Sequence, residues 1–305
     1  MPLPSVLKRP LVSAWNRAHD TARTIRDYAI TIRNGWIGPC SVCGKVRAMV
    51  YHPHYISPTL IQLWELTPRE AAALKRKESC ECSSCGAKLR ARRIADVLMD
   101  LYPAGARSLR QWAASDRARG LRIAEINVID GIHDTLKGLP GFQASDFTPG
   151  VERGATVNGI RCEDFDHLTY DDDSFDLVLT SETLEHVADL RTSLAECMRV
   201  LVPGGFHVFT APVTPHVART FPRARIGPDG KVEQLATAIS HPGGSWGYPV
   251  FTELGVDFPE ILREAGFETE IRFGPLTEDD LAQVYVCRKP TASSVDEPLK
   301  AEAMA

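Results

Sequence analysis

The chain has 305 residues, of which 44% are hydrophobic and 24% are charged, and its formal net charge is −4. A chain of this length folds as one large or two modest domains, and this composition is that of a globular protein in water. No apolar run approaches the roughly 20 residues needed to cross a bilayer, and residues 1–10 lack the apolar stretch of a signal peptide. We therefore expect a cytoplasmic protein, and the net negative charge argues against nucleic acid as its main partner.

The two ends of the chain carry no motif with recognisable chemistry. Residues 11–33 place apolar residues at helical spacing among mixed charges, so we expect residues 1–38 to form an N-terminal helical segment. Residues 291–305 are small and polar, and we expect a disordered tail.

Five of the eight cysteines lie between residues 40 and 85, in two motifs of metal-binding spacing. Cys40-x-x-Cys43 and Cys82-x-x-Cys85 are each followed by glycine, which permits the positive φ of a tight turn around a metal. In a chain without an export signal, such pairs indicate metal and not disulfides. The sequence therefore predicts a zinc segment over residues 39–87, in which four thiolates close a structural Zn²⁺ site. Either Cys80 or Cys82 can supply the fourth thiolate; we favour Cys82 for its spacing and its glycine.

A basic flank overlaps the second cysteine motif. Residues 75–93 contain seven lysines and arginines against two glutamates. Beside a zinc ribbon, such a stretch can bind RNA. The apolar residues from Ile94 to Leu101 recur at helical spacing, which places the arginines on the opposite face of a helix as a solvated or interdomain surface. We favour this second interpretation and keep RNA binding as an alternative.

From residue 121 onward, short apolar runs alternate with helical patterns. Strand–helix–strand units of this length form right-handed crossovers in a parallel sheet, and ligands bind at the carboxyl ends of its strands. The predicted strands are 121–125, 142–146, 156–162, 175–181 and 206–210, with a helix over 194–201 that stops at Pro203-Gly204-Gly205, a helix over 258–265, and a closing antiparallel pair, 268–273 and 283–288.

Four motifs stand out in this region: Glu163-Asp164, Ser174-Phe-Asp-Leu-Val178, Leu184-Glu-His-Val187 and Val200-Leu-Val-Pro-Gly-Gly205. In this order and spacing they resemble the class I S-adenosylmethionine-dependent methyltransferases, over about residues 121–290. The chain is also similar to a bacterial subgroup with an N-terminal cysteine segment and a glycine-poor first motif. The resemblance implies a Rossmann-like α/β fold, a mostly parallel seven-stranded sheet with helices on both faces, for a domain over residues 88–290. It also implies S-adenosylmethionine as the cofactor.

In the family that the chain resembles, the first strand ends in an acidic residue and a glycine-rich loop that carries the methionine end of the cofactor. Here Glu125 holds the acidic position, Gly131 is the glycine that remains, and Asn127 stands where a glycine is usual. Asparagine tolerates left-handed φ better than most residues, so the turn is feasible. The resemblance thus implies a cofactor loop at these three residues.

Further cofactor contacts are expected at the ends of the next three strands. Asp146 lies 21 residues after the acid of the first strand, close to the roughly 20 expected for an acid that accepts from both ribose hydroxyls. By resemblance, Asp164 accepts from the adenine amino group and the backbone amide of Phe165 meets a ring nitrogen. Ser181 and Glu182 end the fourth strand and are expected to line the sulfonium side.

A long polar insertion, residues 214–255, follows the fifth strand and faces the carboxyl ends of the sheet, so we expect a lid over the acceptor. A hydroxyl acceptor needs a general base, and His241 in this insertion is the first candidate, with His186 second. No Asn/Asp-Pro-Pro-aromatic motif follows the fourth strand, where the chain reads Thr180-Ser-Glu-Thr183. This weighs against methylation of a planar amino group.

The resemblance implies a methyltransferase, and we expect it to act on the hydroxyl of a small molecule or a glycan. Two alternatives remain. A zinc-ribbon RNA methyltransferase is supported by the basic flank, and a non-catalytic methyltransferase-like binding scaffold is supported by the glycine-poor loop. Calorimetry with S-adenosylmethionine separates the scaffold from the two enzymes, and RNA affinity with a steep salt dependence identifies the RNA enzyme. The sequence leaves the oligomeric state open.

Overall fold

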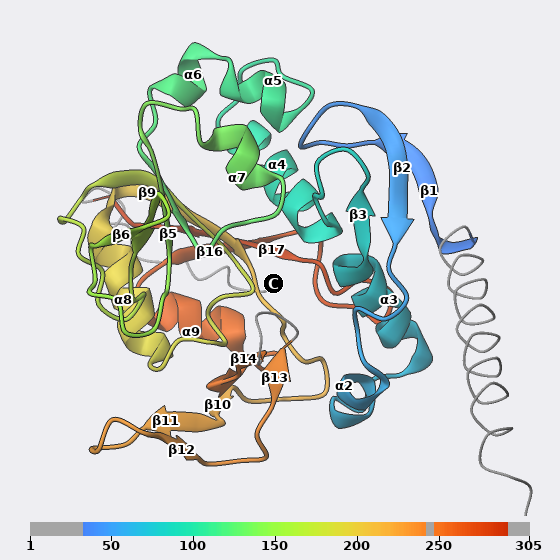
Figure 1. Cartoon of the computed structure of the whole chain (residues 1–305), viewed down its shortest axis with the longest axis vertical. Helices are drawn as coiled ribbons and strands as arrows, with labels where there is room; N and C mark the ends of the chain where they lie inside the picture. The colour runs from blue at the N-terminus through green and yellow to red at the C-terminus, as the bar shows by residue number, and fades with distance from the viewer. Residues whose placement is uncertain (1–32, 242–246, 292–305) are drawn as a thin grey trace, which may run out of the picture.

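A central mixed β-sheet organises the molecule (Figure 1). The computed structural model describes residues 33–241 and 247–291. The strands of the sheet are β4 (Ile123–Ile126), β5 (Phe142–Asp146), β6 (Thr156–Val157), β7 (Ile160–Cys162), β8 (Phe175–Ser181), β9 (Leu201–Thr210), β16 (Glu268–Arg272) and β17 (Val284–Arg288). Their order across the sheet is β16-β17-β9-β8-β4-β5-β7-β6. The strands from β9 to β7 run parallel, while β16, β17 and β6 pair in antiparallel fashion.

The mostly parallel α/β sheet expected from the sequence is confirmed, with one strand more than the seven expected. The third predicted strand, 156–162, is a hairpin of β6 and β7. Asn158 has a φ of 52° and Gly159 a φ of 84°. Two consecutive residues with positive φ form the tight turn that joins antiparallel strands. The chain therefore reverses in the middle of the predicted strand.

The Pro203-Gly204-Gly205 segment does not act as the predicted helix stop. Helix α8 (Leu190–Val200) ends before it, and β9 begins directly at Leu201 and runs through it. The register between β8 and β9 shifts at the start of β8. Proline is tolerated in a strand at such an irregularity, because it has no N–H to give to the ladder.

Hydrophobic clusters pack on both faces of the sheet. Leu177 and Val208 belong to one cluster, and their chain neighbours Val178 and Phe209 belong to the other. Alternate residues of a strand point to opposite faces, and both kinds are buried here because helices cover both faces. The first face holds α4 (Leu89–Leu101), α5 (Leu109–Ala113) and α7 (Ile132–Leu136), with α6 (Asp116–Arg119) after α5, and the second holds α8 and α9 (Phe258–Glu264). Among the described residues, no helix has the length and apolar character needed to span a bilayer.

The cysteine segment forms a small antiparallel sheet of its own. Its strands β1 (Trp36–Pro39), β2 (Val46–Tyr51) and β3 (Cys80–Cys82) pair in that order, and α2 (Pro58–Leu63) and α3 (Pro68–Ser79) connect the last two. The end of the predicted helical segment 1–38 is thus a strand, because aromatic and β-branched residues such as Trp36 and Ile37 favour pairing. Residues 1–32 and 292–305, which hold most of that segment and of the predicted tail, lie outside the described part of the chain.

The cysteine segment shares a core with the central sheet. Cys40 and Cys82 belong to the same hydrophobic cluster as Ile94 of α4 and Leu177 of β8. Packing is therefore continuous across residue 88, where the sequence predicts a domain boundary.

The predicted lid, residues 214–255, contains short strand pairs. These are β10 (Phe221–Pro222) with β15 (Thr252–Glu253), β11 (Ala224–Ile226) with β12 (Val232–Gln234), and β13 (Ser240–His241) with β14 (Tyr248–Pro249). Ile239 and Val250 pack with Leu60 and Trp64 in a third hydrophobic cluster. The lid therefore docks against the N-terminal helices, and β13 lies on the side of α2 (Figure 1).

Candidate functional site

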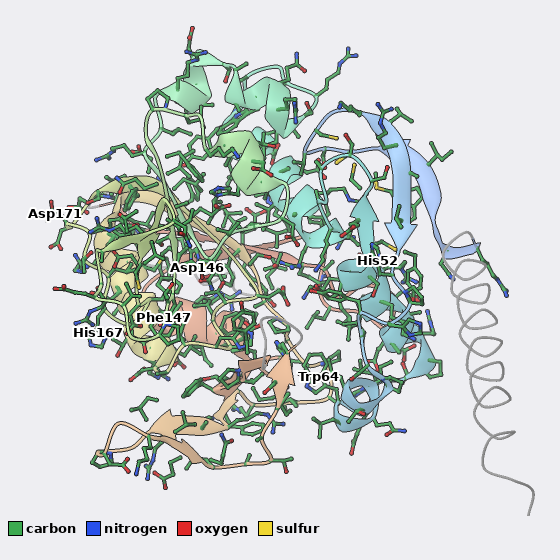
Figure 2. The ribbon with its side chains drawn as sticks, in the orientation of Figure 1. His52, Trp64, Asp146, Phe147, His167 and Asp171 are labelled. Atoms are coloured by element: carbon green, nitrogen blue, oxygen red, sulfur yellow. The ribbon has the colours of Figure 1, made fainter. Side chains whose placement is uncertain are left out.

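Residues that the sequence assigns to the cofactor gather at the carboxyl ends of the parallel strands. Asp146 ends β5, Ser181 ends β8 and Asp164 follows β7. Glu163 N donates to Asp146 O at 3.3 Å, which joins the ends of β5 and β7. Asp146 is exposed, and Phe147 beside it has 57% of its surface exposed (Figure 2). The sequence analysis did not single out Phe147, yet an exposed ring next to a carboxylate suits a nucleoside.

Asp164 and Phe165 have different surroundings. Asp164 Oδ1 accepts from Asp166 N at 3.2 Å within the turn after β7. Phe165 is only 4% exposed, and its ring lies 6.1 Å from the ring of His207. The phenyl group of Phe165 therefore belongs to the core, which leaves the backbone of this residue for the predicted contact.

Glu125 holds the loop after β4 from inside the protein. Its side chain is fully buried; Oε1 accepts from Ile129 N at 3.3 Å, and Oε2 lies 2.7 Å from His133 Nδ1. Burial raises the pKa of Glu125 to about 7, although His133 acts in the opposite direction. Asn127 has a φ of 64°, so the left-handed turn expected at this residue is confirmed. Its Nδ2 donates to Thr183 Oγ1 at 3.2 Å and links the loop to the end of β8.

The cysteine segment packs so closely on residue 131 that only a glycine fits there. Its φ is 74°, and a Cβ at this position would lie 2.9 Å from Cys85 O and 2.9 Å from Ala87 Cβ. Atoms that close leave no room for a side chain. The second cysteine motif therefore presses directly on the predicted cofactor loop.

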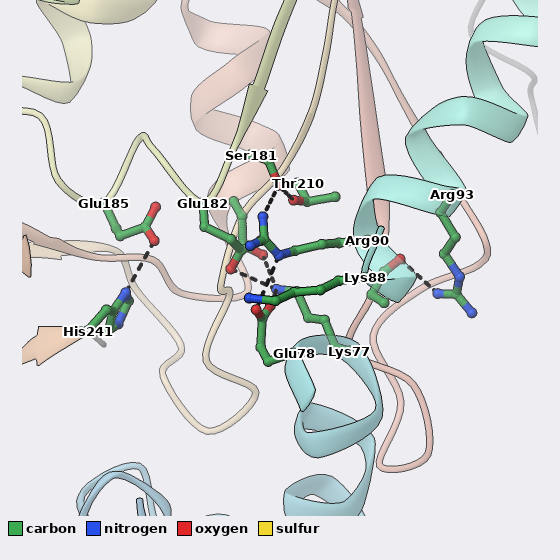
Figure 3. Close-up of polar contacts among 12 residues, drawn as sticks. Lys77, Glu78, Lys88, Arg90, Arg93, Ser181, Glu182, Glu185, Thr210 and His241 are labelled. Carbon is green, nitrogen blue, oxygen red and sulfur yellow. Dashed lines mark hydrogen bonds and ion pairs between the residues drawn. The ribbon is translucent and has the colours of Figure 1, made fainter. Parts of the chain in front are cut away.

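Two cations, one from α3 and one from α4, contact the end of β8 (Figure 3). Arg90 Nη1 donates to Ser181 Oγ at 2.5 Å, and this oxygen also lies 2.8 Å from Thr210 Oγ1. Lys77 Nζ donates to Glu182 Oε2 at 2.9 Å. Glu182 has a φ of 52°, a left-handed backbone that non-glycine residues adopt at some cost. Strain of this kind collects at functional sites.

Three cations of the basic flank are buried, so its interpretation as a solvated face is wrong for them. These are Lys77, Lys88 and Arg92. Arg90 Nε lies 3.1 Å from Glu78 Oε2. A sequence signal for this burial exists in α3, where Lys77 and Glu78 follow Leu74 at helical spacing on its apolar stripe.

The two candidate bases, His241 and His186, both lie against Glu185. Glu185 Oε1 is 3.3 Å from His241 Nδ1 and 3.3 Å from His186 Nε2, and the two ring centroids are 4.9 Å apart. Figure 3 shows the contact of His241 with Glu185. Phe251 N donates to Glu185 O at 2.8 Å, which ties the lid to the turn after β8. The ring of Trp64 lies 5.5 Å from that of His241 and closes this corner.

Glu185 and His241 favour each other's charged forms. Burial raises the pKa of Glu185, but the neighbouring His186 and His241 lower it more, and the result is below the ordinary value of 4.5. Burial lowers the pKa of His241, but Glu185 raises it more, and the result is above 6.5. The site thus keeps a buried carboxylate next to an imidazole that gains a proton easily.

Four sulfur atoms, those of Cys40, Cys43, Cys82 and Cys85, lie within 4.8 Å of one another. The Sγ–Sγ distance is 3.7 Å for Cys40 and Cys85 and 3.8 Å for Cys43 and Cys82. Sulfurs about 2.3 Å from a tetrahedral zinc ion are roughly 3.8 Å apart, so the set fits this metal. The Cys85 thiol lowers the pKa of Cys40 to about 5, while the same contact raises the pKa of Cys85, so this pair favours one thiolate beside one thiol. Cys80 is buried and does not belong to the group.

One comparison with known proteins matches a segment that includes this edge of the sheet. Residues 144–209 match the family described as a methyltransferase domain, and this segment includes Asp146, Asp164 and Glu182. A curated ubiquinone biosynthesis O-methyltransferase from Thiobacillus denitrificans is 31% identical over 134 residues, which are 44% of this chain and 53% of the relative. The chain therefore spans about half the length of this relative. The two matches support an enzyme of the methyltransferase class.

Solved structures also resemble the chain. An S-adenosylmethionine-dependent methyltransferase from Mesorhizobium loti is 23% identical, with 55% of this chain and 91% of that chain covered and a TM-score of 0.36. A methyltransferase of the same kind from Methanosarcina mazei is 16% identical, with 56% and 93% covered and a TM-score of 0.32.

Proposed function

We propose that the protein is an S-adenosylmethionine-dependent methyltransferase that methylates a hydroxyl group of a small molecule or a glycan. The observation that carries the proposal is the position of the matched segment, residues 144–209, whose strand ends bring Asp146, Asp164 and Glu182 to one edge of the sheet. Ligands of such sheets bind at this edge. The O-methyltransferase among the relatives supports an oxygen acceptor.

The cofactor is proposed to lie along the ends of β4, β5, β7 and β8. Asp146 suits the ribose because a carboxylate offers two acceptor oxygens and no competing donor. S-adenosylmethionine supplies the methyl group, which leaves its sulfonium in an in-line displacement. The protein holds the acceptor oxygen in line and keeps water out. The proposed cofactor residues are Glu125, Asn127, Gly131, Asp146, Asp164, Phe165, Ser181 and Glu182.

The acceptor proton is assigned to His241 in first place and to His186 in second. Both imidazoles lie beside the Glu185 carboxylate, which stabilises the imidazolium formed when a ring takes the proton. The lid, residues 214–255, brings His241 to this position from a distant part of the chain. A base of this kind typically contributes a factor of about 10²–10⁴ to the rate.

The cysteine segment, residues 39–87, is proposed to hold one structural Zn²⁺ through Cys40, Cys43, Cys82 and Cys85. Four thiolates leave no open coordination position, so the metal takes no part in the reaction. Cys85 and Ala87 lie close to Gly131. This contact favours a structural role for the cysteine segment, which would hold the cofactor loop of the catalytic domain, residues 88–290, in place.

The RNA-methyltransferase alternative loses support because three of the seven cations on which it rests are engaged within the protein. Lys77 and Arg90 contact Glu182 and Ser181, and Lys88 Nζ donates to Tyr55 Oη at 2.6 Å. Phosphate binding needs cations that face solvent. The scaffold alternative differs from the enzyme in that it binds the cofactor without methyl transfer, which the following experiment tests.

The test combines calorimetry with S-adenosylmethionine and mass spectrometry of acceptor mixtures incubated with the protein and the cofactor. We expect micromolar cofactor affinity and the gain of one methyl group on a hydroxyl compound. Cofactor binding without transfer to any hydroxyl or RNA acceptor would favour the scaffold, and absence of cofactor binding would refute the methyltransferase proposal. Transfer to RNA would favour the alternative enzyme.

A further inference from the structure

Three side chains converge where the turn after β8 meets the lid. Glu185, His186 and His241 each offer one ligand atom, and these atoms all lie within 4.8 Å of one another. Two of the side chains come from adjacent residues, and the third is brought in by β13. Carboxylate and imidazole groups are the ligands that divalent transition metals use in catalytic sites.

The hydrogen bonds of this group leave a cation missing. His186 Nδ1 lies 2.7 Å from Pro249 O; a carbonyl only accepts, so Nδ1 carries the hydrogen. In the neutral ring, His186 Nε2 is then a bare acceptor, and it faces Glu185 Oε1 at 3.3 Å. Both carboxylate oxygens of Glu185 are buried and accept no well-aligned hydrogen bond, although His241 Nδ1 lies 3.3 Å from Oε1. Two acceptors face each other without repulsion only when a proton or a metal ion lies between them.

The spacing of the three atoms suits a metal ion. Nitrogen and oxygen ligands lie about 2.0–2.2 Å from zinc-type ions, so two ligands in a tetrahedral site are roughly 3.4 Å apart. The distances from Glu185 Oε1 to His186 Nε2 and to His241 Nδ1 are both 3.3 Å.

The surroundings hold the ligands in place. Pro249 O fixes the ring of His186 in the way that outer-shell carbonyls orient metal-binding histidines. Phe251 N and Thr252 N donate to Glu185 O at 2.8 and 3.1 Å, so the lid strand fixes the backbone of the carboxylate residue. Two of the three proposed ligands, His186 and Glu185, are therefore held in place by hydrogen bonds to the lid.

We propose that Glu185, His186 and His241 bind a divalent first-row transition-metal ion, distinct from the four-cysteine site, with an open coordination position for the acceptor hydroxyl. The place of the acceptor rests on the proposed methyltransferase function; the metal site itself does not. An ion here lowers the pKa of a coordinated hydroxyl, whose proton passes to solvent. The O–CH₃ bond then forms as the S–CH₃ bond breaks, and sulfur leaves with the electron pair as a thioether. With the ion bound, the two imidazoles would hold it and would not take the proton; without the ion, His241 and His186 remain the bases proposed above.

The test is a titration of the full-length protein, as purified with its cysteine site filled, with Co²⁺ and without cofactor. We expect one additional equivalent of Co²⁺, with the weak visible absorption of a nitrogen–oxygen site and without thiolate charge-transfer bands. His241→Ala and Glu185→Gln should weaken this binding at least about a hundredfold. His216→Ala is the matched control, because His216 pairs with Glu70 at 2.8 Å outside the group, and it should keep the additional equivalent.

If the variants do not fold, nuclear magnetic resonance of the wild-type protein with Co²⁺ tests whether the histidines bind the ion. Bound Co²⁺ should shift and broaden the ring-proton resonances of two histidines. Absence of an additional equivalent, or an additional equivalent that survives both substitutions, would overturn the proposal. A protonated His186 in protein that takes up no Co²⁺ would assign the missing cation to a proton. Calorimetry with S-adenosylmethionine, run separately, tells failure of the metal site from failure of the methyltransferase proposal.

Discussion

Lys77 and Glu182 form an ion pair that joins the N-terminal helices to the end of β8. Lys77 Nζ lies 2.9 Å from Glu182 Oε2, and the two side chains are 1% and 16% exposed. Glu182 is also the residue whose positive φ turns the chain toward Glu185. The pair thus couples the position of α3 to the geometry of the proposed cofactor site at the end of β8.

Breaking this pair on one side should destabilise the protein. Removal of one partner from a buried pair leaves an uncompensated charge and costs about 3–5 kcal/mol. We expect Lys77→Met to lower the free energy of unfolding by about this amount in urea titrations, and the double variant with Glu182→Gln to recover most of it. Lys75→Met, in the same helix, is the control and should have little effect. A double variant as unstable as the single one would exclude the pair as the cause.

Cofactor affinity should depend on Asp146 and Asp164. Hydrogen bonds to charged groups contribute roughly 1.5–3 kcal/mol, and about 1.4 kcal/mol is tenfold in affinity. Asp146→Ala and Asp164→Ala should each weaken S-adenosylmethionine binding about tenfold or more in calorimetry. Asp171→Ala, an exposed aspartate away from these strand ends (Figure 2), should leave it unchanged. Affinity that is indifferent to the first two substitutions would remove both residues from the cofactor site.

The cysteine group should carry one zinc ion per chain. Structural zinc sites have apparent binding energies of about 10–16 kcal/mol, so chelation should unfold the segment and, through Gly131, weaken cofactor binding. Elemental analysis of fresh protein checks the stoichiometry. Cys82→Ser should lose the metal and Cys80→Ser should keep it, because the Cys82 sulfur belongs to the four-atom group. The reverse result would mean that Cys80 is the ligand.

In protein without an ion at Glu185, turnover should depend on His241 and on pH. We expect His241→Ala to keep the fold and cofactor affinity but to lower turnover at least about a hundredfold. Glu185 raises the pKa of His241, so the rate should rise with pH through a value above 6.5. Glu185→Gln should move this limb to lower pH. Unchanged turnover in His241→Ala, with a collapse in His186→Ala, would transfer the role to His186.

Stability should depend on pH through Glu125. Burial raises its pKa from 4.5 to about 7 in the folded protein. Between these values the folded protein holds a proton that the unfolded chain has lost, so the free energy of unfolding falls as pH rises through this window. At about 1.4 kcal/mol per pKa unit, the effect is at most roughly 3 kcal/mol. Glu125→Gln should remove this fall in urea titrations at several pH values. An equal slope in both proteins would contradict the assignment.

Several parts of the fold follow from local sequence. The strands predicted at 142–146 and 175–181 match β5 and β8 in full, because an apolar run between turn residues is a local signal. The predicted strand 156–162 is wrong because Asn158-Gly159 is itself a stronger local signal, for a hairpin turn. The two cysteine motifs likewise predict their own turns, and their sulfurs converge in the structure.

The contacts that make the site come from packing between distant segments. The sequence alone determined the order of the elements, the cysteine motifs and both candidate histidines, because periodicity and turn residues act over a few positions. Tertiary structure decided that His241 and His186 share Glu185, that Lys77 lies buried on Glu182, and that Gly131 makes room for the cysteine segment. The helical spacing in α3 can signal that Lys77 is buried, but no local pattern names its partner, because the partner depends on how helices and strands pack across the sheet.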